Sequence, residues 1–249
     1  HAEQVISAAR AGKHVFVEKP FTMTKASAEA AVAACRKAGV VMALGHNRRF
    51  LPAVAEMKRL VAAGALGTLC HVEGQFSGPS AISFKPGMWR ADRHESPLGG
   101  MGGMGIHMID MMINLAGPIA EVTVRSLTRA LTNGLDDTTA GLFSFASGAT
   151  GCFATLALAP RVWRVALYGT DAALELNGHE KLSFTPREGE GWVKEFPKTD
   201  IEHAELAAFA AAVNGGPAYP LPVEDAIHGV AVFEAMIGAA ASGSTYRVA

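Results

Sequence analysis

The residues best able to do chemistry follow a short apolar run near the start of the chain. Glu18, Lys19 and Pro20 come directly after 15–17 (Val-Phe-Val), which is typical of a strand buried in a parallel sheet. Open α/β sheets bind ligands at the carboxyl ends of their strands, where this lysine would lie, and Pro20 favours extended backbone before it. A partly desolvated lysine there could exchange a proton with a substrate hydroxyl; an ordinary solvated lysine is the alternative.

A second candidate follows a glycine-rich segment. Residues 99–105 contain five glycines, which let the backbone approach a ligand or a packed element, and a helical pattern comes next. The segment is no dinucleotide fingerprint, because no strand directly precedes it and the glycine spacing differs. His107, Asp110 and Asn114 share one face of this helix, whereas the methionines point toward another, which we expect to be the core. His107 is therefore a candidate acid/base, with a structural histidine as the alternative.

Two further polar groups occur where a ligand could reach them. Asn47 and Arg48 follow the apolar run 40–44, so they would lie on the same sheet edge as Lys19. Arg90 stands beside a tryptophan in a long polar loop, 78–98, and this pair suits hydroxyl or carboxylate recognition. The alternatives are an exposed basic hinge for the first group and a loop anchor for the second.

The elements that must position these residues change in kind along the chain. Helical patterns at 1–11 and 23–38 alternate with short apolar strands at 15–17 and 40–44, which is the βαβ signature of a parallel sheet. Two strands do not make a stable sheet, so we expect its other strands to precede His1.

The pattern after residue 50 is typical of an α+β domain. Helical patterns occupy 52–63, 104–116, 201–214 and 223–241, and alternating strand patterns occupy 68–77, 120–129, 138–146, 149–158, 162–168, 172–176, 181–185 and 192–196. We therefore predict an α/β protein in which a remnant of a parallel sheet, 1–50, precedes an α+β domain, 51–249, with a large, mainly antiparallel open sheet.

Composition narrows the class of partner. The 249 residues are 49% hydrophobic and 18% charged with a formal net charge of −1, which argues against nucleic acid and against an anionic membrane surface. We find no apolar run long enough to span a membrane and no secretory segment. The widely spaced Cys35, Cys70 and Cys152 predict free thiols in a reducing, cytoplasmic setting, and no metal site is expected.

Taken together, these segments resemble the Gfo/Idh/MocA family, which comprises glucose–fructose oxidoreductase, inositol dehydrogenase and rhizopine-catabolism proteins. The resemblance spans essentially the whole chain and rests on AGKHVFVEKP at 11–20, GHNRRFLPAV at 45–54, AAGALGTL at 62–69, GIHMID at 105–110 and LYGTDAALEL at 167–176. It implies that 1–50 is the end of a Rossmann-type domain binding NAD or NADP, and that the protein forms a homodimer or homotetramer through its open sheet.

The resemblance also assigns roles to residues. It implies hydride transfer at a hydroxyl-bearing carbon of a sugar, polyol or cyclic diol, with Lys19 binding the reacting hydroxyl and His107 acting as acid/base. Glu18, Lys19 and Pro20 would shape the nicotinamide end of the pocket. The predicted substrate contacts are Asn47, Arg48, Arg90 and Asp110.

Two departures from the family pattern keep other functions open. Gly103 stands where the family usually has an aspartate, four residues before the histidine. The glycine fingerprint for pyrophosphate is expected roughly 70 residues upstream, so this chain alone should bind dinucleotides poorly. The alternatives are a non-catalytic oligomerising or ligand-sensing relative and an NAD-dependent glycosidase.

Overall fold

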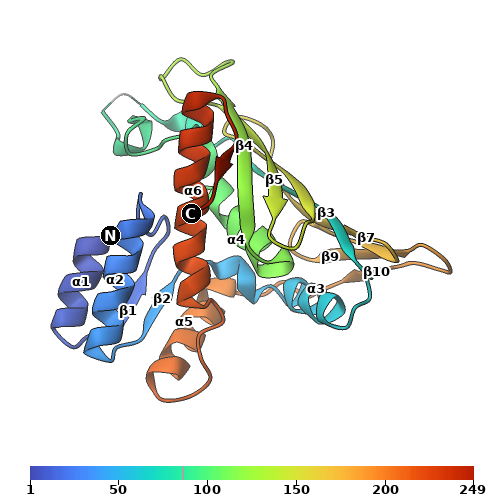
Figure 1. The fold of residues 1–249 in the computed structure, drawn as a ribbon, viewed down its shortest axis with the longest axis horizontal. Coiled ribbons are helices and arrows are strands. Elements are labelled where there is room, and N and C mark those ends of the chain that lie inside the picture. Colours follow the sequence, from blue (N-terminus) through green and yellow to red (C-terminus); the bar gives the residue numbers. More distant parts are fainter. Residues whose placement is uncertain (86) are drawn as a thin grey trace.

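The chain folds into a small parallel sheet and a large open sheet that share helices (Figure 1). The structure is a computed structural model that describes residues 1–85 and 87–249, so Pro86 in the polar loop lies outside the described residues. The helices are α1 Ala2–Arg10, α2 Lys25–Ala38, α3 Pro52–Ala62, α4 Gly105–Ala116, α5 Ile201–Val213 and α6 Val223–Ser242, with short 3₁₀ turns η1 Asn47–Phe50, η2 Ser80–Ser83, η3 Trp89–Ala91 and η4 Gly99–Met101. The strands are β1 Val15–Val17, β2 Met42–Leu44, β3 Leu69–Ser77, β4 Ile119–Leu127, β5 Thr138–Phe145, β6 Thr150–Leu156, β7 Val162–Gly169, β8 Ala172–Asn177, β9 Lys181–Pro186, β10 Trp192–Glu195 and β11 Tyr246–Arg247.

The small sheet has the predicted parallel pairing. Strands β1 and β2 lie side by side in register, with Val15 opposite Met42. Helix α2 between them begins after Thr24, whose hydroxyl caps the helix by accepting a hydrogen bond from the Ser27 amide at 3.3 Å. It ends at Gly39, whose φ of 65° is the left-handed conformation that a glycine adopts without strain.

The core around this small sheet is completed by the end of the chain. Phe16 of β1 packs on Phe209 of α5 with ring centroids 5.7 Å apart, and buried Tyr219, Leu221 and Val230 belong to the same apolar cluster. Helices α5 and α6 therefore stabilise residues 1–50 as well as the large sheet, a connection that no local sequence pattern predicts.

The large sheet has nine strands in the order β10-β9-β8-β7-β3-β6-β5-β4-β11. Every pair is antiparallel except β3 and β6, so the prediction of a mainly antiparallel sheet is confirmed. Strand β11 was not predicted, because two residues are too few to show alternation. Figure 1 shows α4 and α6 on one side of this sheet, while Leu142 on the other side is 66% exposed.

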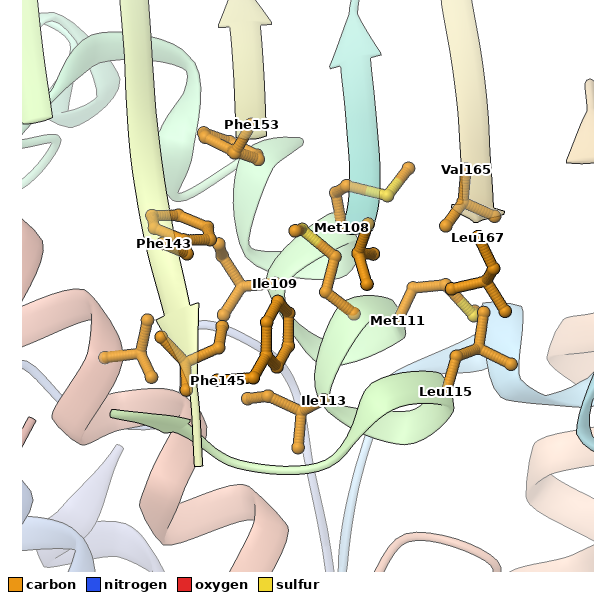
Figure 2. Close-up of a cluster of buried hydrophobic side chains, with 14 of the residues drawn as sticks. Met108, Ile109, Met111, Ile113, Leu115, Phe143, Phe145, Phe153, Val165 and Leu167 are labelled. Carbon is orange, nitrogen blue, oxygen red and sulfur yellow. The ribbon is translucent and has the colours of Figure 1, made fainter. Parts of the chain in front are cut away.

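Helix α4 lies at the centre of the main core. Its side chains Met108, Ile109 and Met111 point toward phenylalanines and aliphatic residues of the sheet (Figure 2). Gly74 of β3 lies directly beneath, where an added Cβ would come 2.7 Å from Met108 Cγ, so the close packing requires glycine there. In the part of the chain that the structure describes, no helix is long and apolar enough to traverse a bilayer.

Candidate active site

The predicted lysine and the glycine-rich segment are in direct contact. Lys19, just beyond the end of β1, donates hydrogen bonds from Nζ to the carbonyl oxygens of Gly103 at 3.0 Å and Gly102 at 3.5 Å. A cavity of about 360 Å³, which we call the lysine cavity, is lined by Lys19, Arg90 and Gly103 among others. Residues 83 and 84 positions apart in the sequence thus form one wall of a ligand-sized space.

The surroundings of Lys19 make its proton easier to remove. Burial lowers the pKa of its ammonium group, and the positive charges of Arg48 and Arg90 lower it further, against the opposing effect of Glu18. A lysine with a lowered pKa can both donate a hydrogen bond to a hydroxyl and exchange a proton with it. Arg90 itself is exposed, and its guanidinium stacks on Trp89, 4.3 Å from the ring centroid.

His107 is buried in the first turn of α4, with 5% of its surface exposed. Arg48 Nη1 lies 3.2 Å from His107 Nε2, and since a guanidinium only donates, Nε2 accepts and the neutral ring carries its proton on Nδ1. Burial, followed by the charges of Arg48, His46 and Lys19, holds the His107 pKa well below 6.5. The ring is therefore neutral at pH 7, and its one lone pair, on Nε2, is directed at Arg48.

This arrangement predicts a titration that responds to Arg48. The imidazole pKa of His107, followed by NMR, should lie well below 6.5, and in Arg48→Gln it should rise yet stay below 6.5, because burial is the larger cause. The unfolded chain, in which the imidazole titrates near 6.5, binds more protons at this position than the folded protein does. The unfolding free energy therefore decreases as pH falls from about 6.5 toward the folded-state pKa. An unchanged His107 titration in Arg48→Gln would contradict the contact; Arg10→Gln, on the exposed end of α1, is the control.

Arg48 and Asn47 lie in a network with carboxylates that the sequence reasoning missed. Arg48 Nη1 donates to Asn47 Oδ1 at 2.8 Å, and Asn47 Nδ2 donates to Glu202 Oε1 at 2.9 Å. Glu205, also on α5, is 4% exposed, and burial followed by Glu18 and Glu202 raises its pKa to about 7. The sequence does show two glutamates, Glu202 and Glu205, one turn apart in an alanine-rich helix. Only the tertiary fold shows that they face Asn47 and Arg48.

Asp110 lies away from the lysine cavity, in a buried ion pair. Both of its carboxylate oxygens accept from Arg49, whose Nε and Nη2 are 2.8–3.0 Å away, and Arg49 Nη2 also reaches Asp225 at 3.1 Å. The side chains of Arg49 and Asp110 are 3% and 6% exposed. Substrate contact by Asp110 stays a prediction, whereas its observed partner is structural. Sequence alone could not tell which of two adjacent arginines pairs with Asp110.

The glycines of 99–105 serve packing at some positions and leave space at another. An added Cβ at Gly99, where φ is +58°, would lie 1.8 Å from the Asp136 carbonyl oxygen, and one at Gly105 would lie 2.4 Å from Met101 Sδ. A Cβ at Gly103 meets nothing within 4 Å. Gly103, where the resemblance leads us to expect an aspartate, is therefore not required by sterics.

These differences predict contrasting variants. Gly99→Ala should destabilise the protein by about 1–3 kcal/mol, because it strains the backbone and collides with a carbonyl group. Gly103→Asp should change the unfolding free energy by about 0.5 kcal/mol or less. Thermal or urea unfolding measures both, and equal stability of the two variants would contradict this account of the glycine-rich segment.

A polar cluster on the open face of the large sheet also escaped the sequence reasoning. Possible ligand atoms of His71, Glu73 and Cys152 lie within 4.8 Å of one another. Each of the first two already has a partner, since His71 Nδ1 is 2.8 Å from the Thr150 hydroxyl and Glu73 is paired with Arg164 at 2.7 Å. Burial, followed by the charge of Glu73, raises the pKa of the Cys152 thiol and so disfavours the thiolate that a metal would need.

Comparison with known proteins connects this geometry to a family. Residues 1–46 match the model described as oxidoreductase family, NAD-binding Rossmann fold, and residues 54–175 match the GFO/IDH/MocA C-terminal domain. Levoglucosan dehydrogenase of Pseudarthrobacter phenanthrenivorans is 34% identical over 49% of this chain and 32% of its own length. The 1,5-anhydro-D-fructose reductase of Ensifer adhaerens is 29% identical over 100% of this chain and 76% of its own length.

Solved structures share the fold over the full chain. Aldose-aldose oxidoreductase from Caulobacter crescentus, complexed with glycerol, superposes with a TM-score of 0.87 at 26% identity, covering 99% of this chain and 76% of that one. Levoglucosan dehydrogenase in complex with NADH and L-sorbose superposes with a TM-score of 0.88 at 24% identity, covering 100% and 77%. With both domain models matched in order, the chain belongs to the Gfo/Idh/MocA family of oxidoreductases.

Proposed function

We propose that the protein transfers hydride between NAD or NADP and a hydroxyl-bearing carbon of a sugar, polyol or cyclic diol. The observation that carries this proposal is the convergence of Lys19, His107 and Arg48 at one edge of the small sheet. Lys19 has a lowered pKa and His107 is a buried neutral base, which together suit removal of a proton from an alcohol. The relatives named as sugar dehydrogenases and reductases support the same class of substrate.

The residues present fit the nicotinamide end of such a cofactor. A cavity of about 830 Å³ at the end of β1 is lined by His1, Glu18, Lys19, Pro20 and Arg90 among others. When bound, the cofactor supplies the hydride acceptor or donor. The glycines of 99–105 are not a binding site for the cofactor's pyrophosphate, because several of them pack closely against other parts of the protein.

The chain's own residues handle the substrate proton in this proposal. Lys19 Nζ, already a donor to the Gly103 carbonyl, hydrogen-bonds the reacting hydroxyl and lowers the cost of its ionisation. His107 Nε2 receives the proton in the oxidative direction once the substrate hydroxyl replaces the Arg48 guanidinium at that nitrogen, and it returns the proton in the reductive direction. Without substrate, Arg48 orients the ring through its contact with Nε2 and favours the neutral form. Asn47 and Arg90 bind other substrate hydroxyls.

We also propose a homodimer or homotetramer formed through the uncovered face of the large sheet. Leu142 and Val193 are more than 60% exposed there or at its edge. Arg164 lies between Glu73 and Glu175, so these charges are already paired within one subunit before two subunits meet.

The free thiols Cys35, Cys70 and Cys152 support a cytoplasmic setting. We place the boundary between the two domains at residues 50 and 51.

The function is tested by following reduction of NAD⁺ and NADP⁺ by the whole protein against inositols, aldoses and cyclic diols. We expect turnover with at least one class. Cleavage of a glycoside without net cofactor reduction would instead favour the glycosidase alternative, and binding of sugars without either reaction would favour the ligand-sensing alternative.

A further inference from the structure

A second cavity, adjacent to the lysine cavity, has an unusual set of polar groups. It measures about 670 Å³ and lies where β3 ends and β7 begins, with Arg48, Phe76, Arg161, Trp163 and His179 among its lining residues. We call it the arginine cavity. Its size is that of a site for a small organic ligand.

The arginine cavity adjoins the place where the reacting hydroxyl is proposed to bind. Ser80 and Met104 line both cavities, so they share a wall. Arg48, which holds His107 Nε2, lines the arginine cavity directly. A molecule held at Lys19 can therefore extend a substituent toward Arg161 and His179.

The charge of the arginine cavity is of one sign. Its described lining includes two arginines and a histidine and no carboxylate, whereas the lysine cavity contains Glu95. Glu180 and Glu202 act on His179, and Glu202 and Glu205 act on Arg48, but none of these carboxylates lines the cavity. The site is thus built to receive negative charge.

Arg161 is an exposed arginine that lines the arginine cavity. Several guanidinium groups of this protein meet carboxylates, as in the pairs of Arg59 with Glu56 at 2.8 Å and Arg187 with Asp171 at 3.3 Å, whereas others, such as Arg125 and Arg129, form no such pair among the described residues. Among the described residues, no carboxylate lies within 4.0 Å of Arg161. Its five donors remain available for a ligand.

The walls add apolar surface and buried donors. Phe76 and Trp163 provide aromatic surface, and Trp163 is 7% exposed. Arg48 Nε is a buried donor without a hydrogen-bond partner among the described residues, and such a donor gains from an added acceptor. Aromatic walls with a free guanidinium suit a carbon ring that carries an anionic group.

We infer that the arginine cavity binds an anionic substituent of the substrate, a carboxylate or a phosphate monoester, through Arg161, with Arg48 and His179 as further donors. The inference rests on the proposed function in placing the reacting hydroxyl at Lys19, and it narrows the substrate class to sugar or polyol acids and phosphates. Planar, bidentate recognition of such groups is what a guanidinium does best.

The test is equilibrium binding by calorimetry on the whole protein with D-glucose, D-glucuronate and D-glucose 6-phosphate as probes. We expect at least one anionic probe to bind more tightly than D-glucose. Arg161→Gln should weaken that anion's binding about ten- to a hundredfold and leave D-glucose unaffected. Arg161→Lys should recover part of the loss, and Arg10→Gln, which removes an equal charge far from the cavity, should change nothing.

Two results would overturn the inference. One is equal binding, or no binding, of the neutral and anionic probes by the unaltered protein. The other is an anion preference that persists in Arg161→Gln. Because binding is measured without turnover, an intact preference for anions with no cofactor reduction by any substrate would sink the proposed function and leave the anion site standing.

Discussion

Replacing Lys19 by methionine is expected to lower kcat/KM of the whole protein by roughly 10²–10³-fold, the range that loss of one donor to a developing oxyanion costs. Methionine keeps the apolar stem but removes the donor to the Gly103 carbonyl and the group whose pKa is lowered by burial and by Arg48. Steady-state kinetics with the best substrate of the screen measure the effect.

Two matched variants sharpen this prediction. Lys19→Arg keeps a cationic donor at the site but cannot lose a proton. Because His107 is proposed to receive the substrate proton and Lys19 to act as a donor, part of the activity lost in Lys19→Met should return in Lys19→Arg. Lys13→Met removes an exposed lysine of the same segment and should leave kcat/KM unchanged. Full activity in Lys19→Met would remove Lys19 from the catalytic assignment.

The second large effect is expected at Asp110, and it concerns stability. Asp110→Ala leaves the Arg49 guanidinium buried with only Asp225 as a charged partner, so the unfolding free energy should fall by about 3–5 kcal/mol. The matched control is Asp171→Ala, which breaks an exposed pair with Arg187 and should cost less than about 1 kcal/mol. Urea unfolding measures both.

The Asp110 variants also decide between two roles for this residue. Replacing the pair together, as Arg49→Met with Asp110→Leu, should recover much of the stability lost in the single variant, because the only carboxylate that then loses its arginine, Asp225, is 34% exposed. If Asp110→Ala instead has the unfolding free energy of the unaltered protein and a raised KM, Asp110 contacts the substrate as the family resemblance implies. Its assignment as the structural partner of Arg49 would then be wrong.

The sequence predicted the order of elements well, because local patterns determine them. Alternation identified the long strands of the large sheet, and the apolar runs before Lys19 and Asn47 identified the parallel pair. Packing between distant segments was not predictable in this way. Nothing near Phe16 indicates that Phe209 covers it, and nothing near residue 246 indicates a strand.

The site shows the same division. Lys19 follows a strand and His107 lies at the start of a helix, so the neighbouring sequence was enough to identify both as candidate site residues. The role of Arg48 in orienting His107, the buried Glu205 on α5 and the pairing of Asp110 with Arg49 all depend on which side of an element faces its neighbour. The adjacent residues Arg48 and Arg49 have nearly identical local sequence, yet Arg48 contacts the neutral ring of His107 and Arg49 pairs with the carboxylate of Asp110.

The most direct test of hydride transfer through this site uses a substrate deuterated at its hydroxyl-bearing carbon. With the whole protein and the oxidised cofactor, mass spectrometry should find deuterium in the reduced nicotinamide, and Lys19→Met with His107→Asn should abolish its appearance while Lys13→Met does not. Deuterium retained in the substrate carbon throughout turnover, or transferred equally by the Lys19 and His107 double variant, would contradict the account.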